Sequence, residues 1–167
     1  MTIRTTRIAS IGVGAALLAA AFAGCGGSDG DSGALSKEDF IAQADQICAD
    51  SIAESKTNED DFVAAIGAND IETAADIIAA NGDLISEGVD QVEALEAPEE
   101  DQETIDEFIS ISREQVDLLA ELADAIRADD GAAVEEISAE GETIQAESDA
   151  LADEYGMVDC GSAGNEA

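Results

Sequence analysis

The stretch that decides the fold is PEEDQETIDEFISISREQVDLLAELADAIRADDG, residues 98–131. Its large apolar side chains recur every three or four residues, a spacing typical of one face of an amphipathic helix. They are Ile105, Phe108, Ile109, Val116, Leu119, Leu122 and Ile126. The only proline of the chain precedes this run, and RADDG at 127–131 interrupts it. The stretch therefore predicts one long helix with a helix-breaking signal at each end.

Helical patterns continue on both sides of this stretch. Ser36 is expected to cap a first helix, Asn58 a short one, and Asp70 to open a longer one that ends before the proline. A last helix is expected from about Ala132 to Gly156, which is well placed as its terminating glycine. No run alternates apolar and polar residues as a strand would. The sequence thus predicts an all-α fold, an up-down antiparallel bundle of four main helices plus a short extra helix.

Two further features concern the helices themselves. AIGANDIETAADIIA (65–79) and AIRADDGAAVEEISA (125–139) match in register, as a duplicated helical hairpin or chance similarity between alanine-rich helices would produce. Gly82, Gly88 and Gly141 fall inside predicted helices, where each costs about 1 kcal/mol relative to alanine. Close helix contacts and helix bends both explain such glycines, and the sequence leaves both open.

The charge balance restricts the partners. The chain carries 40 acidic and 6 basic residues and no histidine, for a net charge of −34. Such a surface repels the phosphate backbone, so we expect no nucleic acid partner. Because 46% of the residues are apolar and recur with helical spacing, a folded body is expected instead of a solvated tail.

Residues 1–24 have the pattern of an export signal. Two arginines precede an apolar run over residues 8–22, which is short for a membrane span. Ala23 and Gly24 then precede Cys25, and this arrangement resembles a bacterial lipobox. The resemblance implies that Cys25 is lipidated and becomes the mature N-terminus, which would anchor the protein to the membrane.

The competing interpretation is ordinary signal cleavage after Ala23, which would release a soluble protein. The cysteine count favours lipidation, because a lipidated Cys25 leaves Cys48 and Cys160 as an even pair. In an exported protein such a pair predicts a disulfide, whereas the absence of a CxxC motif and of histidine argues against a redox or metal role.

These boundaries divide the chain into four parts. Residues 1–24 are the expected signal peptide, and residues 25–35 the lipid-anchored flexible tether. Residues 36–160 form the expected acidic bundle, and residues 161–167 a flexible C-terminal tail.

The lipobox-like end, LSKEDFIAQADQIC (35–48) and YGMVDCG (155–161) together resemble a group of actinobacterial proteins. These are small secreted or lipid-anchored helical proteins, largely uncharacterised. The resemblance implies an extracytoplasmic address and an all-α fold, and it implies no activity.

We therefore expect a lipoprotein on the extracytoplasmic face of the cell membrane that acts as a non-catalytic interaction or ligand-binding module. Its partner, an unknown protein or small molecule, is not specified by the sequence, and we expect no cofactor, metal or catalytic residue. An alternative is divalent-cation binding by the acidic clusters at 58–61, 98–101 and 128–130. An enzyme is disfavoured because the chain lacks histidine and tryptophan.

Overall fold

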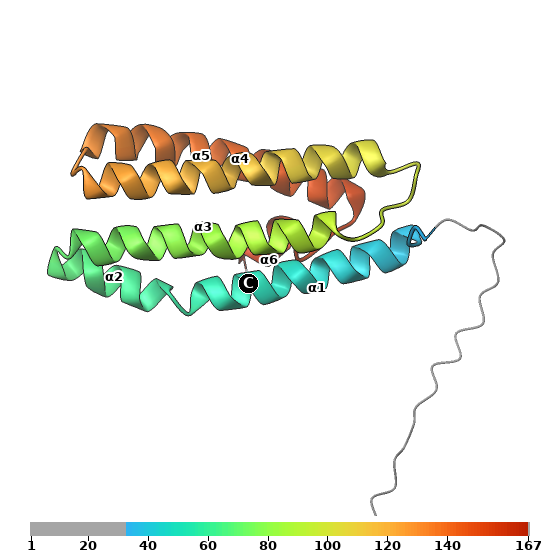
Figure 1. Cartoon of the computed structure of the whole chain (residues 1–167), viewed down its shortest axis with the longest axis horizontal. Helices are drawn as coiled ribbons and strands as arrows, with labels where there is room; N and C mark the ends of the chain where they lie inside the picture. Colours follow the sequence, from blue (N-terminus) through green and yellow to red (C-terminus); the bar gives the residue numbers. More distant parts are fainter. Residues whose placement is uncertain (1–32, 167) are drawn as a thin grey trace, which may run out of the picture. The chain divides into compact units, whose positions relative to one another are not determined.

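The computed structural model describes residues 33–166, which form a bundle of helices (Figure 1). The helices are α1 (Lys37–Lys56), α2 (Glu59–Ala68), α3 (Ile71–Glu93), α4 (Gln102–Arg127), α5 (Gly131–Tyr155) and α6 (Ser162–Glu166). No strand occurs in this part of the chain, so the predicted all-α bundle is confirmed. The expected signal peptide, Cys25 and most of the tether lie outside the described residues.

Four rods make up the bundle. Figure 1 shows α1 and α2 end to end along α3, and both pack against it. The chain then returns as α4, which packs on α3, and again as α5, which packs on α4. The first rod is therefore α1 and α2 together, and the short extra helix continues α1 instead of adding a fifth rod. α6 contacts both α1 and α5, and so joins the first rod to the last.

Short polar side chains start three of the helices, and the sequence predicts two of these caps, Ser36 and Asp70. The side-chain oxygens of Ser36, Asp70 and Asp130 accept hydrogen bonds from backbone N–H groups in the first turns of α1, α3 and α5. Each bond satisfies a donor that has no partner within its helix. Asn58 differs, because its side chain makes no cap bond and donates from Nδ2 to Oδ1 of Asn81 at 3.1 Å.

The two sequence-similar stretches form the same turn. Asn69 and Asp129 both adopt the left-handed conformation, with φ of 57° and 52°. In each turn the backbone N–H of the next aspartate donates to an alanine carbonyl of the preceding helix, at 2.9 and 3.0 Å. That aspartate then caps the following helix. The α2–α3 and α4–α5 connections therefore have the same turn conformation and the same hydrogen bonds.

The core is concentrated at one end of the bundle. We call residues 33–48, 85–112 and 144–166 the closed half, and residues 49–84 and 113–143 the open half. The continuous core cluster lies entirely in the closed half and includes Phe40, Val92, Ile105, Phe108, Ile109, Tyr155 and Met157. Among the described residues, every buried hydrophobic residue of the open half is an alanine: Ala65, Ala74, Ala75, Ala123 and Ala125. The open half therefore has no fully buried large apolar side chain.

The C-terminus differs from its expected form. Residues 161–167 were expected to be a flexible tail, but Ser162–Glu166 form α6, which packs on α1 and α5. Gly161 and Gly164 allow this packing, because a Cβ at either position would collide with a neighbouring side chain or carbonyl. The Ser162 hydroxyl also donates to Oδ2 of Asp153 at 2.7 Å. Glycines that suggest flexibility in the sequence here permit close approach.

The glycines inside helices have different surroundings. A Cβ at Gly82 would lie 3.5 Å from Cβ of Leu119, and one at Gly88 would lie 2.8 Å from Oγ of Ser51. Both therefore sit at close helix contacts. A Cβ at Gly141 would meet nothing within 4 Å, so neighbouring atoms do not require glycine there.

Candidate ligand-binding cavity

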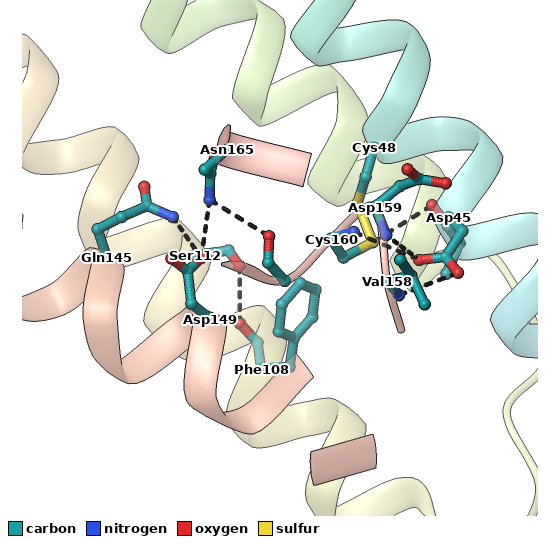
Figure 2. Close-up of a disulfide and its surroundings, with 12 residues drawn as sticks. Asp45, Cys48, Phe108, Ser112, Gln145, Asp149, Val158, Asp159, Cys160 and Asn165 are labelled. Atoms are coloured by element: carbon teal, nitrogen blue, oxygen red, sulfur yellow. Dashed lines mark hydrogen bonds between the residues drawn. A yellow bond between two sulfur atoms is a disulfide. The ribbon is translucent and has the colours of Figure 1, made fainter. Parts of the chain in front are cut away.

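A disulfide closes the bundle. The sulfur atoms of Cys48, in α1, and Cys160, after α5, are 2.07 Å apart and join positions 112 residues apart in the chain (Figure 2). This is the pairing that the sequence predicts. It fixes the segment between α5 and α6 against the side of α1.

Asp45 holds the same segment from the α1 side. Its carboxylate accepts hydrogen bonds from the backbone N–H groups of Val158, Asp159 and Cys160, at 3.1, 2.9 and 3.3 Å. Figure 2 shows Asp45 beside these residues, next to the disulfide. Hydrogen bonds to a charged acceptor are stronger than neutral ones, so this contact reinforces the covalent link.

Behind the disulfide lies an interhelical cavity of about 130 Å³, which we call the inner cavity. One side is apolar and is formed by Ile47, Ile52, Ile85, Val89, Val92 and Phe108. The other side is polar and is formed mainly by Ser112, Gln115, Gln145, Ser148 and Asn165. An apolar cavity with a few convergent polar groups is the usual form of a small-molecule site.

A second hollow, the outer groove, runs between α4 and α5. It lies mostly in the open half and reaches the adjoining residues of α5 in the closed half. It has a volume of about 550 Å³. Its apolar surface comes from Leu118, Leu119, Leu122, Ile137 and Ala146, and its polar residues include Glu142 and Asp149. Gly141 also lines the groove, and the absence of a side chain there widens it.

Two glutamines separate the hollows. Gln115 and Gln145 line both of them, and Nε2 of Gln115 donates a hydrogen bond to Oε1 of Gln145. Nε2 of Gln145 donates in turn to Oδ1 of Asp149 at 2.7 Å, and Nδ2 of Asn165 donates to the same oxygen at 2.9 Å. Flexible polar side chains therefore line the boundary, and their α5–α6 part is drawn in Figure 2.

A polar contact fastens the far end of the closed half. The Tyr155 hydroxyl donates to Oδ2 of Asp101 at 2.9 Å, and Nζ of Lys37 lies 3.8 Å from the centre of the Tyr155 ring. The ring also meets Phe40 edge to face, with centroids 6.0 Å apart. Burial of the phenol, followed by its bond to Asp101, raises the pKa of Tyr155 above its ordinary value.

The acidic clusters at 58–61, 98–101 and 128–130 mostly serve helix ends. Asp130 caps α5, Asp101 accepts from Tyr155, and Glu59, Asp60 and Asp61 stand in the first turn of α2. Carboxylates at a helix N-terminus are stabilised by the helix dipole. Within residues 33–166, no three acidic or cysteine side chains are grouped so that they could hold a metal ion.

Sequence reasoning identified the cysteine pair and missed the hollows. A usable signal was present, because Ser112 and Gln115 in α4 share a helix face with apolar core residues. In α5, Gly141, Gln145 and Ser148 form a similar small and polar stripe. Polar and small residues at inward-facing helical positions mark places where two helices do not pack tightly.

No family model, curated protein or solved structure matches this chain. Among the residues that the structure describes, no helix combines the length and the apolar character needed to cross a membrane. The inner cavity and the outer groove are therefore the features of the described chain that bear on its function.

Proposed function

We propose that this protein is a lipid-anchored, extracytoplasmic binding module that holds a small, largely apolar molecule between α4 and α5. The anchor at Cys25 is supported by the lipobox-like sequence and by the pairing of the two remaining cysteines. The binding role is supported by the outer groove and the adjoining inner cavity.

The observation that carries the proposal is Gly141. It stands in the middle of a 25-residue helix, where glycine costs about 1 kcal/mol relative to alanine. No neighbouring atom requires it, since a Cβ would enter open space. What glycine provides at this position is access to the outer groove, which it lines.

The sizes of the hollows suit small molecules. The outer groove, at about 550 Å³, falls within the range of roughly 300–1,000 Å³ that ligand sites occupy. The inner cavity, at about 130 Å³, is close to the ~150 Å³ of an engineered cavity that binds benzene. A ligand body therefore fits the groove, and a ring or short chain end fits the cavity.

The lining supports binding without catalysis. Its polar groups are amides, hydroxyls and carboxylates, and the Ser112 hydroxyl donates to the Phe108 carbonyl at 2.8 Å instead of to a base. Activating a hydroxyl for attack needs an adjacent general base. That base is commonly histidine, and the chain has no histidine.

A polarity-sensitive neutral dye, Nile red, tests the binding role. We expect saturable binding to the wild type, and binding at least about tenfold weaker in Gly141→Leu, because the new side chain fills the groove. The matched control is Gly67→Leu in α2, where a Cβ also meets nothing within 4 Å and no described hollow is lined. Equal binding by all three proteins, or no binding to the wild type, would refute the proposal.

The intact mass of protein extracted from its native membrane tests the anchor. We expect a chain that begins at Cys25, carries diacylglycerol and gains ~2 Da on reduction of the disulfide. A chain that begins at Gly24 and is recovered from the medium would contradict the anchor and indicate a secreted protein.

A further inference from the structure

We infer that the ligand of the outer groove is a hydrophobic amine, a protonated amine carried on a hydrocarbon body. This inference rests on the proposed function and adds the chemical class of the ligand. It follows from the charges at the groove and from the direction of the hydrogen bonds there.

The charges near the groove are negative. Glu142 and Asp149, both in α5, line it, and no lysine or arginine lines either hollow. The two arginines of α4 bind acidic residues of α3, because Arg113 pairs with Asp90 and Arg127 with Asp76. Within the described chain, an anionic ligand would therefore find carboxylates and no positive partner at the groove.

The polar atoms at the groove also suit a donor. Asp149 accepts its two described hydrogen bonds, from Gln145 and Asn165, on Oδ1, which leaves Oδ2 to accept another. Glu142 is exposed and has two further acceptor oxygens. An ammonium group has three donors and no acceptor, so it matches these oxygens better than a hydroxyl or a carboxylate would.

The remainder of the groove suits the hydrocarbon body. Leu118, Leu119, Leu122 and Ile137 provide apolar surface next to the two carboxylates. The Gln115–Gln145 hydrogen bond lies at the boundary with the inner cavity. Both side chains line the two hollows, so the end of an extended chain would meet them at this boundary.

Three compounds with the same tail test the inference by displacing Nile red: dodecylammonium, dodecanol and dodecanoate, each used as a monomer. Salt near 1 M, where the Debye length is ~3 Å, removes general attraction to the acidic surface. We expect dodecylammonium to displace the dye at a concentration about fivefold lower than dodecanol, from one close charge pair at an exposed carboxylate. Dodecanoate should be the weakest competitor.

A matched pair of variants locates the amine. Glu142→Gln removes a groove carboxylate and should weaken dodecylammonium about fivefold more than it weakens dodecanol. Glu87→Gln removes an exposed carboxylate of α3 that lines neither hollow and should change neither compound.

The two hypotheses fail in different ways. Equal displacement by dodecylammonium and dodecanol would overturn the amine inference and leave the proposed apolar binding intact. A loss of dodecylammonium preference in Glu87→Gln equal to that in Glu142→Gln would overturn it too, because the preference would then come from the whole surface. Absence of Nile red binding to the wild type would refute the proposed function itself.

Discussion

The two halves of the bundle are built from the same helices and packed in opposite ways. The closed half buries Phe40, Phe108 and Tyr155 and carries the disulfide. The open half buries only alanines among its hydrophobic residues and leaves Val63 and Ile66 of α2 63% and 50% exposed. Because burial of large apolar side chains supplies most folding free energy, the closed half stabilises the fold. The outer groove lies mostly in the open half, whereas the inner cavity lies mostly in the closed half.

The difference also explains the role of the C-terminal segment. α1 and α5 are the first and last rods of the bundle, and α6 with the segment before it joins them. Asp45 and the disulfide hold this segment only at the closed half. The C-terminal segment therefore fastens the first and last rods together at the closed half.

Removing the disulfide should have the largest effect. Cys48→Ser combined with Cys160→Ser releases a loop of 112 residues, which in the chain-entropy model costs up to ~4–5 kcal/mol of unfolding free energy. Denaturant unfolding of the variant, and of the wild type with and without reductant, measures the loss. A loss below ~1 kcal/mol would show that the closed half does not depend on this link.

Truncating a large apolar side chain should lower the unfolding free energy by different amounts in the two halves. Phe40→Ala in the fully buried closed core should cost roughly 3–5 kcal/mol. Leu122→Ala at the outer groove should cost less, below about 2 kcal/mol, because Leu122 is already half-buried beside open space. Denaturant unfolding compares the two variants, and equal losses would contradict the division into a closed and an open half.

The single tyrosine gives the closed half a dependence on pH. Its raised pKa means that the folded state holds the phenol proton more tightly than the unfolded state, whose tyrosine titrates near ~10. The resulting stabilisation is fully present below about pH 10 and is lost as the pH rises through the folded pKa. Absorbance at 295 nm should show no phenolate in the folded protein at about pH 10.5, and roughly three-quarters ionisation in denaturant.

The control for this prediction is Tyr155→Phe, which removes the titrating group and the hydrogen bond to Asp101. It should lower the unfolding free energy by about 1–2 kcal/mol at neutral pH and abolish the alkaline dependence that Tyr155 causes. If the folded and denatured proteins titrate together, Tyr155 is not held as the structure describes.

The smallest and opposite effects are expected at two glycines, one inside α5 and one that caps its C-terminus. Gly156 ends the helix with φ of 103°, so Gly156→Ala should cost about 1 kcal/mol. Gly141→Ala should gain about 0.5–1 kcal/mol, because helix propensity improves and the new methyl group enters open space. Thermal unfolding of both variants measures the signs, and destabilisation by Gly141→Ala would contradict the open surroundings of that residue.

The sequence was sufficient to predict the helices and insufficient to predict the space between them. Apolar spacing and the caps Ser36 and Asp70 are local signals, and the structure has helices at those places. The disulfide was also predictable, since lipidation of Cys25, which the lipobox-like sequence implies, would leave Cys48 and Cys160 as an even pair. The volume of a hollow depends on how several helices pack, and local patterns do not determine that.

The C-terminal helix α6 shows why close packing around glycines could not be predicted from the sequence. Gly161 and Gly164 are indistinguishable in the sequence from the glycines of a flexible tail. Only the positions of Asp153 and Asp159 around them show that their missing side chains make room for packing. Gly141 is the reverse case, since only the structure shows that no neighbour requires it.

Hydrogen exchange of the full protein, with and without Nile red, tests most directly whether the open half is the binding half. We predict fast exchange in residues 113–143 of the free protein and slow exchange in residues 85–112, because thinly packed segments open more often. Bound dye should slow exchange mainly in α4 and α5 around Gln115, Gly141 and Gln145. Equal protection of both halves in the free protein, or dye protection confined to the closed half, would contradict this division of roles.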